Sequence, residues 1–222
     1  MLIFRPTLDN DSLTAFLVRQ ANHLVPDGDE LTVESLRPRV AEAVTRVHDC
    51  FRNINKKYYR EGNDILFSHL HSDHWAMFLY LVSNTVYRAG DENVAAKLFI
   101  LNKALHGVDA FYGIGLPETF LFVHPVGTVL GNAKYGNYFV TYQNCAIGAT
   151  ESGYPTFGDG VVFYAKSSCL GGCQIGDEVV FGANSFLIDK DVPSNSVVIG
   201  QFPGQKIKPN EMTARERVFG WL

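Results

Sequence analysis

The residues best suited to chemistry in this sequence are a histidine and an aspartate that stand fifteen positions apart. His124 lies in the segment HPVGTVLG, and Asp109 stands where the helical character of the chain ends. A histidine that takes a proton from a hydroxyl group needs an acceptor on its other ring nitrogen, and a carboxylate there fixes the tautomer and stabilises the imidazolium. Asp109 is a candidate for that acceptor. The alternative is that His124 is a surface histidine at a chain corner and Asp109 a turn residue.

A six-residue repeat follows these two residues and indicates the scaffold that positions them. From Phe157 to Gly200 the chain divides into FGDGVV, FYAKSS, CLGGCQ, IGDEVV, FGANSF, LIDKDV, PSNSVV and IG. A period of six fits neither a helix nor a plain strand, and it predicts a parallel β-helix in which three hexads close one coil. The first residue of each hexad should point inward, namely Phe157, Phe163, Cys169, Ile175, Phe181, Leu187 and Ile199, with Pro193 as the exception. The second residue should be small because the backbone bends there, as at Gly158, Gly176, Gly182 and Gly200.

The fold class predicted for the whole chain is α+β, with the helices first. Four amphipathic helices are expected before residue 108: one from Asp11 to Leu24, one with Pro38 in its first turn that runs toward Tyr58, one from about Ser72 and one from Asp91. Glycines, aromatics and β-branched residues dominate afterwards, and the hexads sum to about four coils. Residues 152–156 fall outside the repeat and should form a loop. The predicted domains are 1–107 (helical), 108–204 (β-helix) and 205–222 (a tail that is basic and then helical).

The composition and charge of the chain argue against several classes of binding partner and cellular location. The net charge is -4 and the sequence pI is about 6.0, so no broad basic surface is available for nucleic acid or an anionic membrane. The first residues, MLIFRPTLDNDS, lack the apolar run of a signal peptide, and no apolar stretch is long enough to span a membrane. We therefore expect a cytoplasmic protein. The four cysteines stand at no metal-binding or redox spacing and should be reduced core residues.

The second half of the chain resembles the serine O-acetyltransferases, which belong to the hexapeptide-repeat, left-handed β-helix acyltransferases. The resemblance is carried by Val108-Asp109, the step to His124, the segment from His124 to Gly131, and the stretches IGDEVVFGANS and DVPSNSVVIG. It implies that His124 is the general base on the acceptor hydroxyl and that Asp109 orients it. It also implies acetyl-CoA as the donor and a homotrimer, or a dimer of trimers, with active sites between neighbouring β-helices. The helical domain would then serve oligomerisation and the acceptor side.

The same resemblance implies where acetyl-CoA would bind. The amide that stabilises the oxyanion would come from Ala165 or Lys166. CoA would lie in the outer groove along Ala165, Gly182 and Ala183 and the C-terminal segment. Its phosphates would meet Lys206 and Lys208, although a short cationic tail is also often simply solvated.

Departures from the family pattern concern the acceptor. Val123 occupies the place where the serine enzymes carry an acidic residue, and Gly153 and Tyr154 replace an Arg-His pair that grips the serine carboxylate. Losing a bidentate arginine removes the group best suited to a carboxylate, which disfavours free serine. A sugar hydroxyl or amine is the alternative, because aromatic residues can stack on a sugar face. The candidates for stacking are Tyr112, Phe122, Tyr142 and Tyr154, unless they are core or interface residues.

The segment SHLHSDH is the other cluster of polar side chains with possible chemistry. His69, His71, Asp73 and His74 lack an obvious fourth ligand on one face, so we expect no metal. Asp73 is a candidate acceptor contact, because the resembling enzymes place an acidic residue of the helical domain near the acceptor. Two further readings are a zinc carbonic anhydrase of the β-helix type, disfavoured by a single histidine on the coils, and a catalytically silent assembly module.

Overall fold

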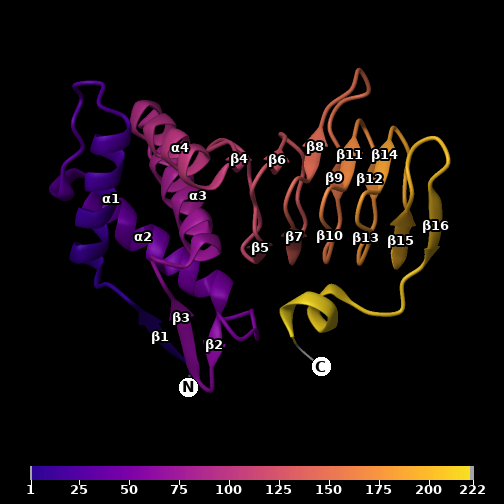
Figure 1. Ribbon diagram of the computed structural model, residues 1–222, viewed down its shortest axis with the longest axis horizontal. Coiled ribbons are helices and arrows are strands. Elements are labelled where there is room, and N and C mark those ends of the chain that lie inside the picture. The colour runs from indigo at the N-terminus through magenta and orange to yellow at the C-terminus, as the bar shows by residue number, and fades with distance from the viewer. Residues whose placement is uncertain (1, 221–222) are drawn as a thin grey trace. The chain divides into compact units, whose positions relative to one another are not determined.

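The computed structural model describes residues 2–220, which form two compact units. One unit contains the chain up to Gly107 together with Phe111–Gly113, and it holds all four α-helices. The other contains Val108–Ala110 and the chain from Ile114 onward, and it is built of short strands (Figure 1).

The helical unit is built around helix α3, which is buried on all sides over most of its length. Its helices are α1 (Asn10–Leu24), α2 (Val33–Phe51), α3 (Ser72–Arg88) and α4 (Glu92–His106). Every residue from Asp73 to Val86 is buried, because α3 packs against both α2 and α4. The helix α2 starts earlier than predicted, because Thr32 and Ser35 form a capping box ahead of it. Pro38 therefore lies inside this helix, which also ends before Tyr58.

A small sheet in the helical unit was not predicted from the sequence. Its strands are β1 (Ile3–Pro6), β2 (Arg60–Glu61) and β3 (Asp64–Phe67), in the order β1-β3-β2. β1 pairs with β3 in parallel and β2 pairs with β3 antiparallel. These strands are too short to show an alternating pattern, so the sequence signal for them is weak.

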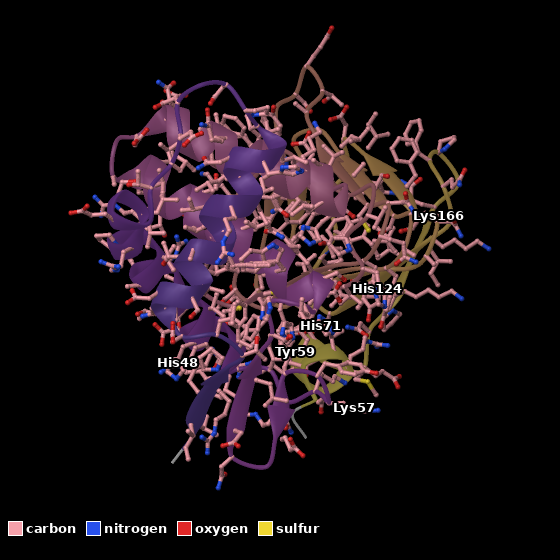
Figure 2. All side chains as sticks on the ribbon, turned by 60° about the vertical axis from the view of Figure 1, so that its left-hand side comes forward. His48, Lys57, Tyr59, His71, His124 and Lys166 are labelled. Atoms are coloured by element: carbon pink, nitrogen blue, oxygen red, sulfur yellow. The ribbon has the colours of Figure 1, made fainter. Side chains whose placement is uncertain are left out.

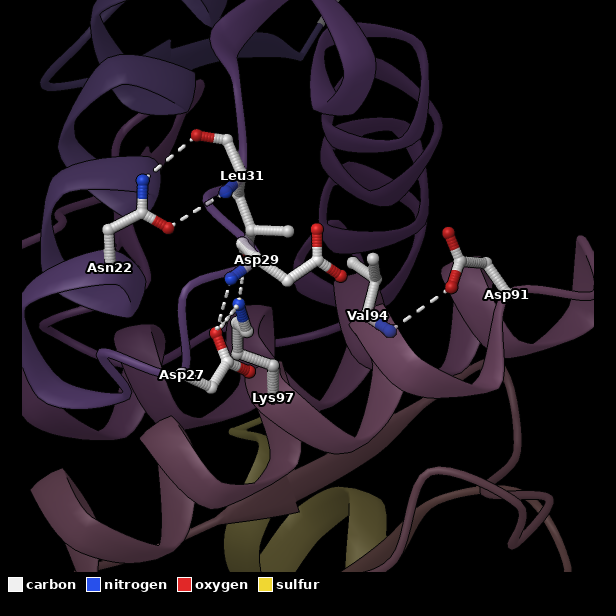
Figure 3. Close-up of polar contacts among 7 residues, drawn as sticks. All are labelled: Asn22, Asp27, Asp29, Leu31, Asp91, Val94 and Lys97. Carbon is white, nitrogen blue, oxygen red and sulfur yellow. Dashed lines mark hydrogen bonds and ion pairs between the residues drawn. The ribbon is translucent and has the colours of Figure 1, made fainter.

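A buried lysine fastens the connection between α1 and α2 to helix α4 (Figure 3). Lys97 is 5% exposed, and its Nζ donates to Asp27 at 2.7 Å and to the carbonyl oxygen of Asp29. This contact lowers the pKa of the Asp27 carboxyl. Asn22 holds the same connection through two hydrogen bonds of 2.9 Å to the backbone of Leu31. The buried ammonium group of Lys97 is stable here because the Asp27 carboxylate and the Asp29 carbonyl oxygen accept from it.

The second unit is the predicted parallel β-helix, with three columns of short strands. One column runs β5 (Phe120–Phe122), β7 (Phe139–Thr141), β10 (Val162–Phe163), β13 (Val180–Phe181) and β15 (Ser196–Ile199). The second runs β4 (Asp109–Ala110), β6 (Val129–Leu130), β8 (Ala146–Gly148), β11 (Ser168–Leu170) and β14 (Phe186–Ile188). The third contains β9 (Thr156–Phe157) and β12 (Gln174–Ile175). Five coil strands in each of the first two columns mean about five coils, one more than the hexads indicate.

The hexad pattern predicts the interior of the β-helix correctly up to its last coil. Six of the seven predicted inward residues, from Phe157 to Leu187, are buried. Ile199 was predicted wrongly: it is 45% exposed, and Val198 is fully buried in its place. The register slips by one because Val192, rather than Pro193, pairs with Ile175 and turns inward. All four cysteines are buried, and none of them forms a disulfide bond.

The C-terminal segment of the described chain packs back onto the β-helix. β16 (Lys206–Pro209) pairs antiparallel with β15, and a π-helical turn, Arg215–Phe219, follows. The Arg215 guanidinium lies 4.2 Å from the centre of the Tyr138 ring, and the buried Phe219 ring meets Tyr138 edge-on. Among residues 2–220, no helix is both long and apolar enough to cross a bilayer.

Side chains link successive coils at one corner of the β-helix. The backbone N–H of Thr119 donates to Asn137 Oδ1 at 2.9 Å, that of Asn137 to Asp159 Oδ1 at 2.7 Å, and that of Asp159 to Asp177 Oδ1 at 2.8 Å. The N–H of Asp177 then donates to Ser194 Oγ at 2.9 Å. Each coil thus supplies the acceptor that satisfies a corner amide of the coil before it, and we call this row of contacts the corner ladder.

The glycines beside the corner ladder are needed for space rather than for a bend. A Cβ on Gly136 would lie 2.2 Å from the carbonyl oxygen of Gly158, and one on Gly176 would lie 2.5 Å from the amide nitrogen of Ser194. A Cβ on Gly158 would meet Asp177 at 2.3 Å. Of the four glycines predicted to bend the chain, only Gly200 has a positive φ, of 85°. Gly158 and Gly176 let adjacent coils approach closely.

We expect Asp177→Ala to lower the free energy of unfolding of the β-helix by about 1 kcal/mol, because the amide of Asp159 loses its acceptor. Asp177→Asn keeps an oxygen acceptor at the same place and is the matched control. Urea unfolding of the three proteins measures the difference. Equal midpoints for the alanine and asparagine variants would show that the corner ladder does not hold the coils.

Candidate active site

His124 occupies an enlarged corner of the first complete coil. Phe122 pairs with Thr141, and Val129 pairs with Ala146. The first coil advances seven residues between these two pairs, whereas the next coil advances five. The first coil therefore carries two additional residues at this corner. His124 itself has a φ of 48°, a conformation that is uncommon for residues other than glycine, and it is exposed (labelled in Figure 2). Such backbone strain is often found at functional sites.

Asp109 lies on the strand that pairs with the end of this corner. It belongs to β4 and pairs with Val129 of β6, and its N–H donates to the carbonyl oxygen of Thr128 at 2.8 Å. The side chain is half-buried. The two residues predicted for catalysis thus lie on successive turns of the chain, which the pairing of β4 with β6 joins.

Outward-facing aromatic residues stand on the coils next to His124. Val123 directly follows Phe122, and the pairing of Phe122 with Thr141 and of Thr141 with Phe163 aligns Val123 with Tyr142 and Tyr164. The rings of Tyr142 and Tyr164 are 5.0 Å apart at 40°, and both side chains are half-buried. Burial, with a smaller contribution from Tyr164, raises the pKa of Tyr142. Tyr164 was not predicted from the sequence, because the loop before β9 shifts the six-residue repeat between Tyr142 and Tyr164.

Two of the four aromatic residues predicted to stack on a sugar are unsuited to it. Phe122 is fully buried inside the β-helix. Tyr112 is 6% exposed, belongs to the helical unit and donates from its hydroxyl group to Glu92 Oε1 at 3.0 Å. Both face inward because their side chains fill hydrophobic cores. Tyr142 and Tyr154 remain candidates.

The predicted CoA-binding residues gather along one edge of the β-helix. Continuing the same register by one residue aligns Gln143, Ala165, Ala183 and Gly200 on successive coils. On the first coil, the N–H of Asn144 donates to the carbonyl oxygen of Val126, so Val126 takes this place and His124 lies in the additional part of the corner before it. Gly182 lies one position before Ala183, and Lys166 one position after Ala165. Lys206 and Lys208 are exposed on β16, where they pair with Ile199 and Val197.

Lys166 cannot supply the predicted oxyanion amide. Its N–H already donates to the carbonyl oxygen of Gln143 at 2.9 Å, a contact that the left-handed corner at Lys166, with φ 62°, makes possible. The Ala165 amide remains the candidate for that role.

The loop at residues 149–155 is held by hydroxyl groups rather than by charges of its own. Thr150 Oγ1 donates to Asp189 Oδ1 at 2.8 Å, and Ser152 Oγ donates to the same oxygen. These hydrogen bonds lower the pKa of the Asp189 carboxyl. Tyr154 is 45% exposed, and its ring lies against the backbone of Gly131, where a Cβ would be 2.9 Å from it. The loop sequence ATESGYP contains no cation that could hold a carboxylate.

The segment SHLHSDH belongs to the helical unit, where its side chains serve separate contacts. His69 Nδ1 lies 2.8 Å from Thr7 Oγ1, and the backbone N–H of Ser68 donates to His74 Nδ1 at 3.2 Å. Asp73 is buried in the first turn of α3, 3.5 Å from the hydroxyl group of Ser72. Across the described part of the chain, no three histidine, cysteine or acidic side chains come together as a metal site.

The geometry can be set beside that of known proteins. No family model matches the chain. The serine acetyltransferase of Synechococcus elongatus is 34% identical over 137 residues, which are 60% of this chain and 55% of that protein. That of Staphylococcus epidermidis is 29% identical over 138 residues, 60% of this chain and 64% of that protein. The chain thus spans less than two thirds of the length of these relatives.

Solved structures extend the likeness to both units. Serine acetyltransferase from Neisseria gonorrhoeae aligns with 93% of this chain and 81% of its own, with a TM-score of 0.70 at 20% identity. The same enzyme in complex with serine gives a TM-score of 0.68 at 23% identity, over 91% of this chain and 84% of its own. The fold is that of the serine acetyltransferases. The predicted resemblance is therefore confirmed, and it covers the helices as well as the β-helix.

The burial of His74 predicts a loss of stability in acid. Desolvation, with a smaller contribution from His71, lowers the pKa of His74 to about 3, whereas an unfolded histidine titrates near 6.5. Above pH 6.5 neither state is protonated; as the pH falls further, only the unfolded state takes up the proton. We expect His74 to account for about 2 kcal/mol of lost stability between pH 6.5 and pH 5.

Urea unfolding at pH 7 and pH 5 measures this contribution. His74→Gln should lose less stability than the parent over this range, whereas His23→Gln, which changes an exposed histidine, should lose as much as the parent. An equal loss in the parent and in His74→Gln would contradict the assignment.

Proposed function

We propose that the protein is an acetyl-CoA-dependent O-acetyltransferase in which His124 is the general base. The observation that carries the proposal is the place of His124, an exposed and strained residue at an enlarged corner of a β-helix with the serine acetyltransferase fold. Sequence similarity to serine acetyltransferases supports the same class of reaction.

In the proposed reaction, the imidazole of His124 takes the proton from the acceptor hydroxyl as its oxygen attacks the thioester carbonyl carbon. Asp109 orients the ring and stabilises the imidazolium. The amide of Ala165 donates to the oxyanion that forms on the carbonyl oxygen. Collapse of the tetrahedral intermediate breaks the carbon–sulfur bond, and the CoA thiolate takes the proton back from His124. The products are an acetyl ester and free CoA.

The donor would bind along the edge that carries Ala165, Gly182 and Ala183. These positions have little or no side chain, so the pantetheine arm can approach the backbone closely. Lys206 and Lys208 extend from β16 toward solvent and would neutralise the phosphates of CoA. We propose a homotrimer, or a dimer of trimers, in which these edges face neighbouring β-helices, and a location in the cytoplasm.

The acceptor is a small molecule with a hydroxyl group, an amino acid such as serine or a sugar. One solved relative is described as a complex with serine, which favours the first class. The surroundings of His124 in this chain favour the second, because apolar Val123 adjoins the Tyr142–Tyr164 pair and the loop at 149–155 carries no cation. Aromatic rings bind the apolar face of a saccharide and offer nothing to a free carboxylate. A sugar O- or N-acetyltransferase is therefore the second candidate. Asp73 stays a proposed acceptor contact.

A screen for free CoA released from acetyl-CoA tests the function and the acceptor together. L-serine, homoserine and nucleotide sugars are compared at equal concentration with the purified protein, and we expect at least one sugar to exceed serine. Serine as good as any other acceptor would contradict the inference from Val123, Gly153 and Tyr154. Absence of release with every acceptor, together with absence of acetyl-CoA binding by calorimetry, would overturn the transferase proposal and favour an assembly module.

A further inference from the structure

A cavity of about 400 Å³ lies within the helical unit, between the small sheet and the start of α3. Its size falls in the range of small-molecule sites. It is lined by Arg5, Thr7, Lys57, Tyr58, Leu66, Phe67, Ser68, Leu70, His71 and His74, all from one unit. Lys57 and His71, with buried Tyr59 beside them, can be located in Figure 2. The transferase chemistry proposed above uses none of the lining residues.

His74, which lines this cavity, has a buried hydrogen-bond donor without an acceptor. Because the N–H of Ser68 donates to Nδ1, that nitrogen carries the lone pair. The ring is 1% exposed and neutral, so its hydrogen is on Nε2. His74 Nε2 is buried and has no hydrogen-bond partner. A buried donor without an acceptor is destabilising, and such groups are rare unless a ligand or water completes them.

The neighbouring His71 is in a similar position. Its Nδ1 is also buried and without a hydrogen-bond partner, and its ring stacks on that of His74 with centres 4.1 Å apart. His71 is the N-cap residue of α3, yet its side chain makes no capping hydrogen bond. The ring is held instead by contacts with the rings of Tyr58, Tyr59 and His74, which leave its Nδ1 without a polar partner. The start of a seventeen-residue helix adds a partial positive charge at the same place.

Charge and apolar surface define what the cavity can accept. Arg5 and Lys57 are cations in its lining, and no lining residue is acidic. Arg5 pairs with Asp64 through Nε at 3.3 Å, which leaves its two terminal nitrogens outside that contact. Asp73, in the first turn of α3, is the nearest acid in sequence and does not line the cavity. Tyr58 and Leu70 are 59% and 80% exposed at the cavity, and they would cover an apolar body.

We propose that this cavity binds a small organic anion, whose carboxylate or phosphate oxygens accept from His74, His71 and the cations Arg5 and Lys57, and whose apolar part packs on Tyr58 and Leu70. An anionic oxygen can accept a hydrogen bond from His74 Nε2, and its negative charge is attracted by the cations Arg5 and Lys57. All the residues that carry this proposal belong to the helical unit.

Nuclear magnetic resonance of the histidine ring nitrogens in the full, ¹⁵N-labelled chain tests the site directly. Inorganic phosphate and benzoate are titrated separately at constant ionic strength, with sodium chloride as the reference salt. We expect the ring signals of His71 and His74 to shift along a saturable curve with phosphate, benzoate or both, and the anion that binds identifies the head group. No saturable shift beyond that of sodium chloride would overturn the proposal, as would a His74 tautomer with its hydrogen on Nδ1.

Matched variants locate the anion. Arg5→Gln and Lys57→Gln should each weaken binding by about tenfold, equivalent to about 1.4 kcal/mol. Lys56→Gln removes an equally exposed neighbouring charge that does not line the cavity, and it should leave the affinity within about twofold of the parent. Equal weakening by Lys56→Gln and Lys57→Gln would show that general charge, rather than this cavity, attracts the anion.

Discussion

The close stacking of parallel coils is the constraint on which the β-helix and its candidate active site depend. Neighbouring strands in a sheet lie about 4.8 Å apart, so each corner of one coil must fit beneath the same corner of the next. The corner ladder meets this constraint with one side-chain acceptor per coil, from Asn137 through Ser194. The glycines beside it remove the Cβ atoms that would otherwise collide with backbone. A coil with a corner of different length therefore loses the regular packing against its neighbours at that corner.

His124 is found at such a departure. The two additional residues of its corner move it out of the regular stack, while Asp109 and the next coils remain in register beneath and beside it. Regular coils on one side supply the small residues Ala165 and Ala183, and they supply the aromatic pair Tyr142–Tyr164. The same stacking thus gives a rigid platform and one irregular residue, an arrangement suited to a positioned base.

The sequence predicts the interior of the β-helix well, because the inward residues recur every six positions and must be apolar to fill the core of the coil. It fails where the corner length changes: the turn before Val192 is shorter than the grid assumes, so Ile199 faces outward. The repeat predicted that Gly158 and Gly176 are needed for bends. They are needed instead because the backbone of the neighbouring coil lies too close for a Cβ atom, and this proximity cannot be predicted from the local sequence. The sheet formed by β1, β2 and β3 joins segments far apart in sequence, which no local pattern encodes.

For the candidate site, residue type and spacing together with the resemblance predict His124 and Asp109, and their catalytic roles stay predictions. Tyr164 could not be predicted, because its alignment with Tyr142 depends on how many residues the intervening loop adds. The backbone hydrogen bond from the Lys166 amide to Gln143 could not be predicted either, because it forms only once the coils are stacked. The cavity beside His71 and His74 likewise arises from tertiary packing, although the histidine-rich segment marked the region.

The central claim is that His124 performs the chemistry, and the rate of CoA release by His124→Ala tests it most directly. The variant is compared with the parent and with His23→Ala, an exposed histidine of α1, using the best acceptor and saturating acetyl-CoA. The account predicts a fall in kcat of at least about a hundredfold for His124→Ala alone, with an unchanged urea midpoint. Parental activity in a folded His124→Ala protein would contradict it.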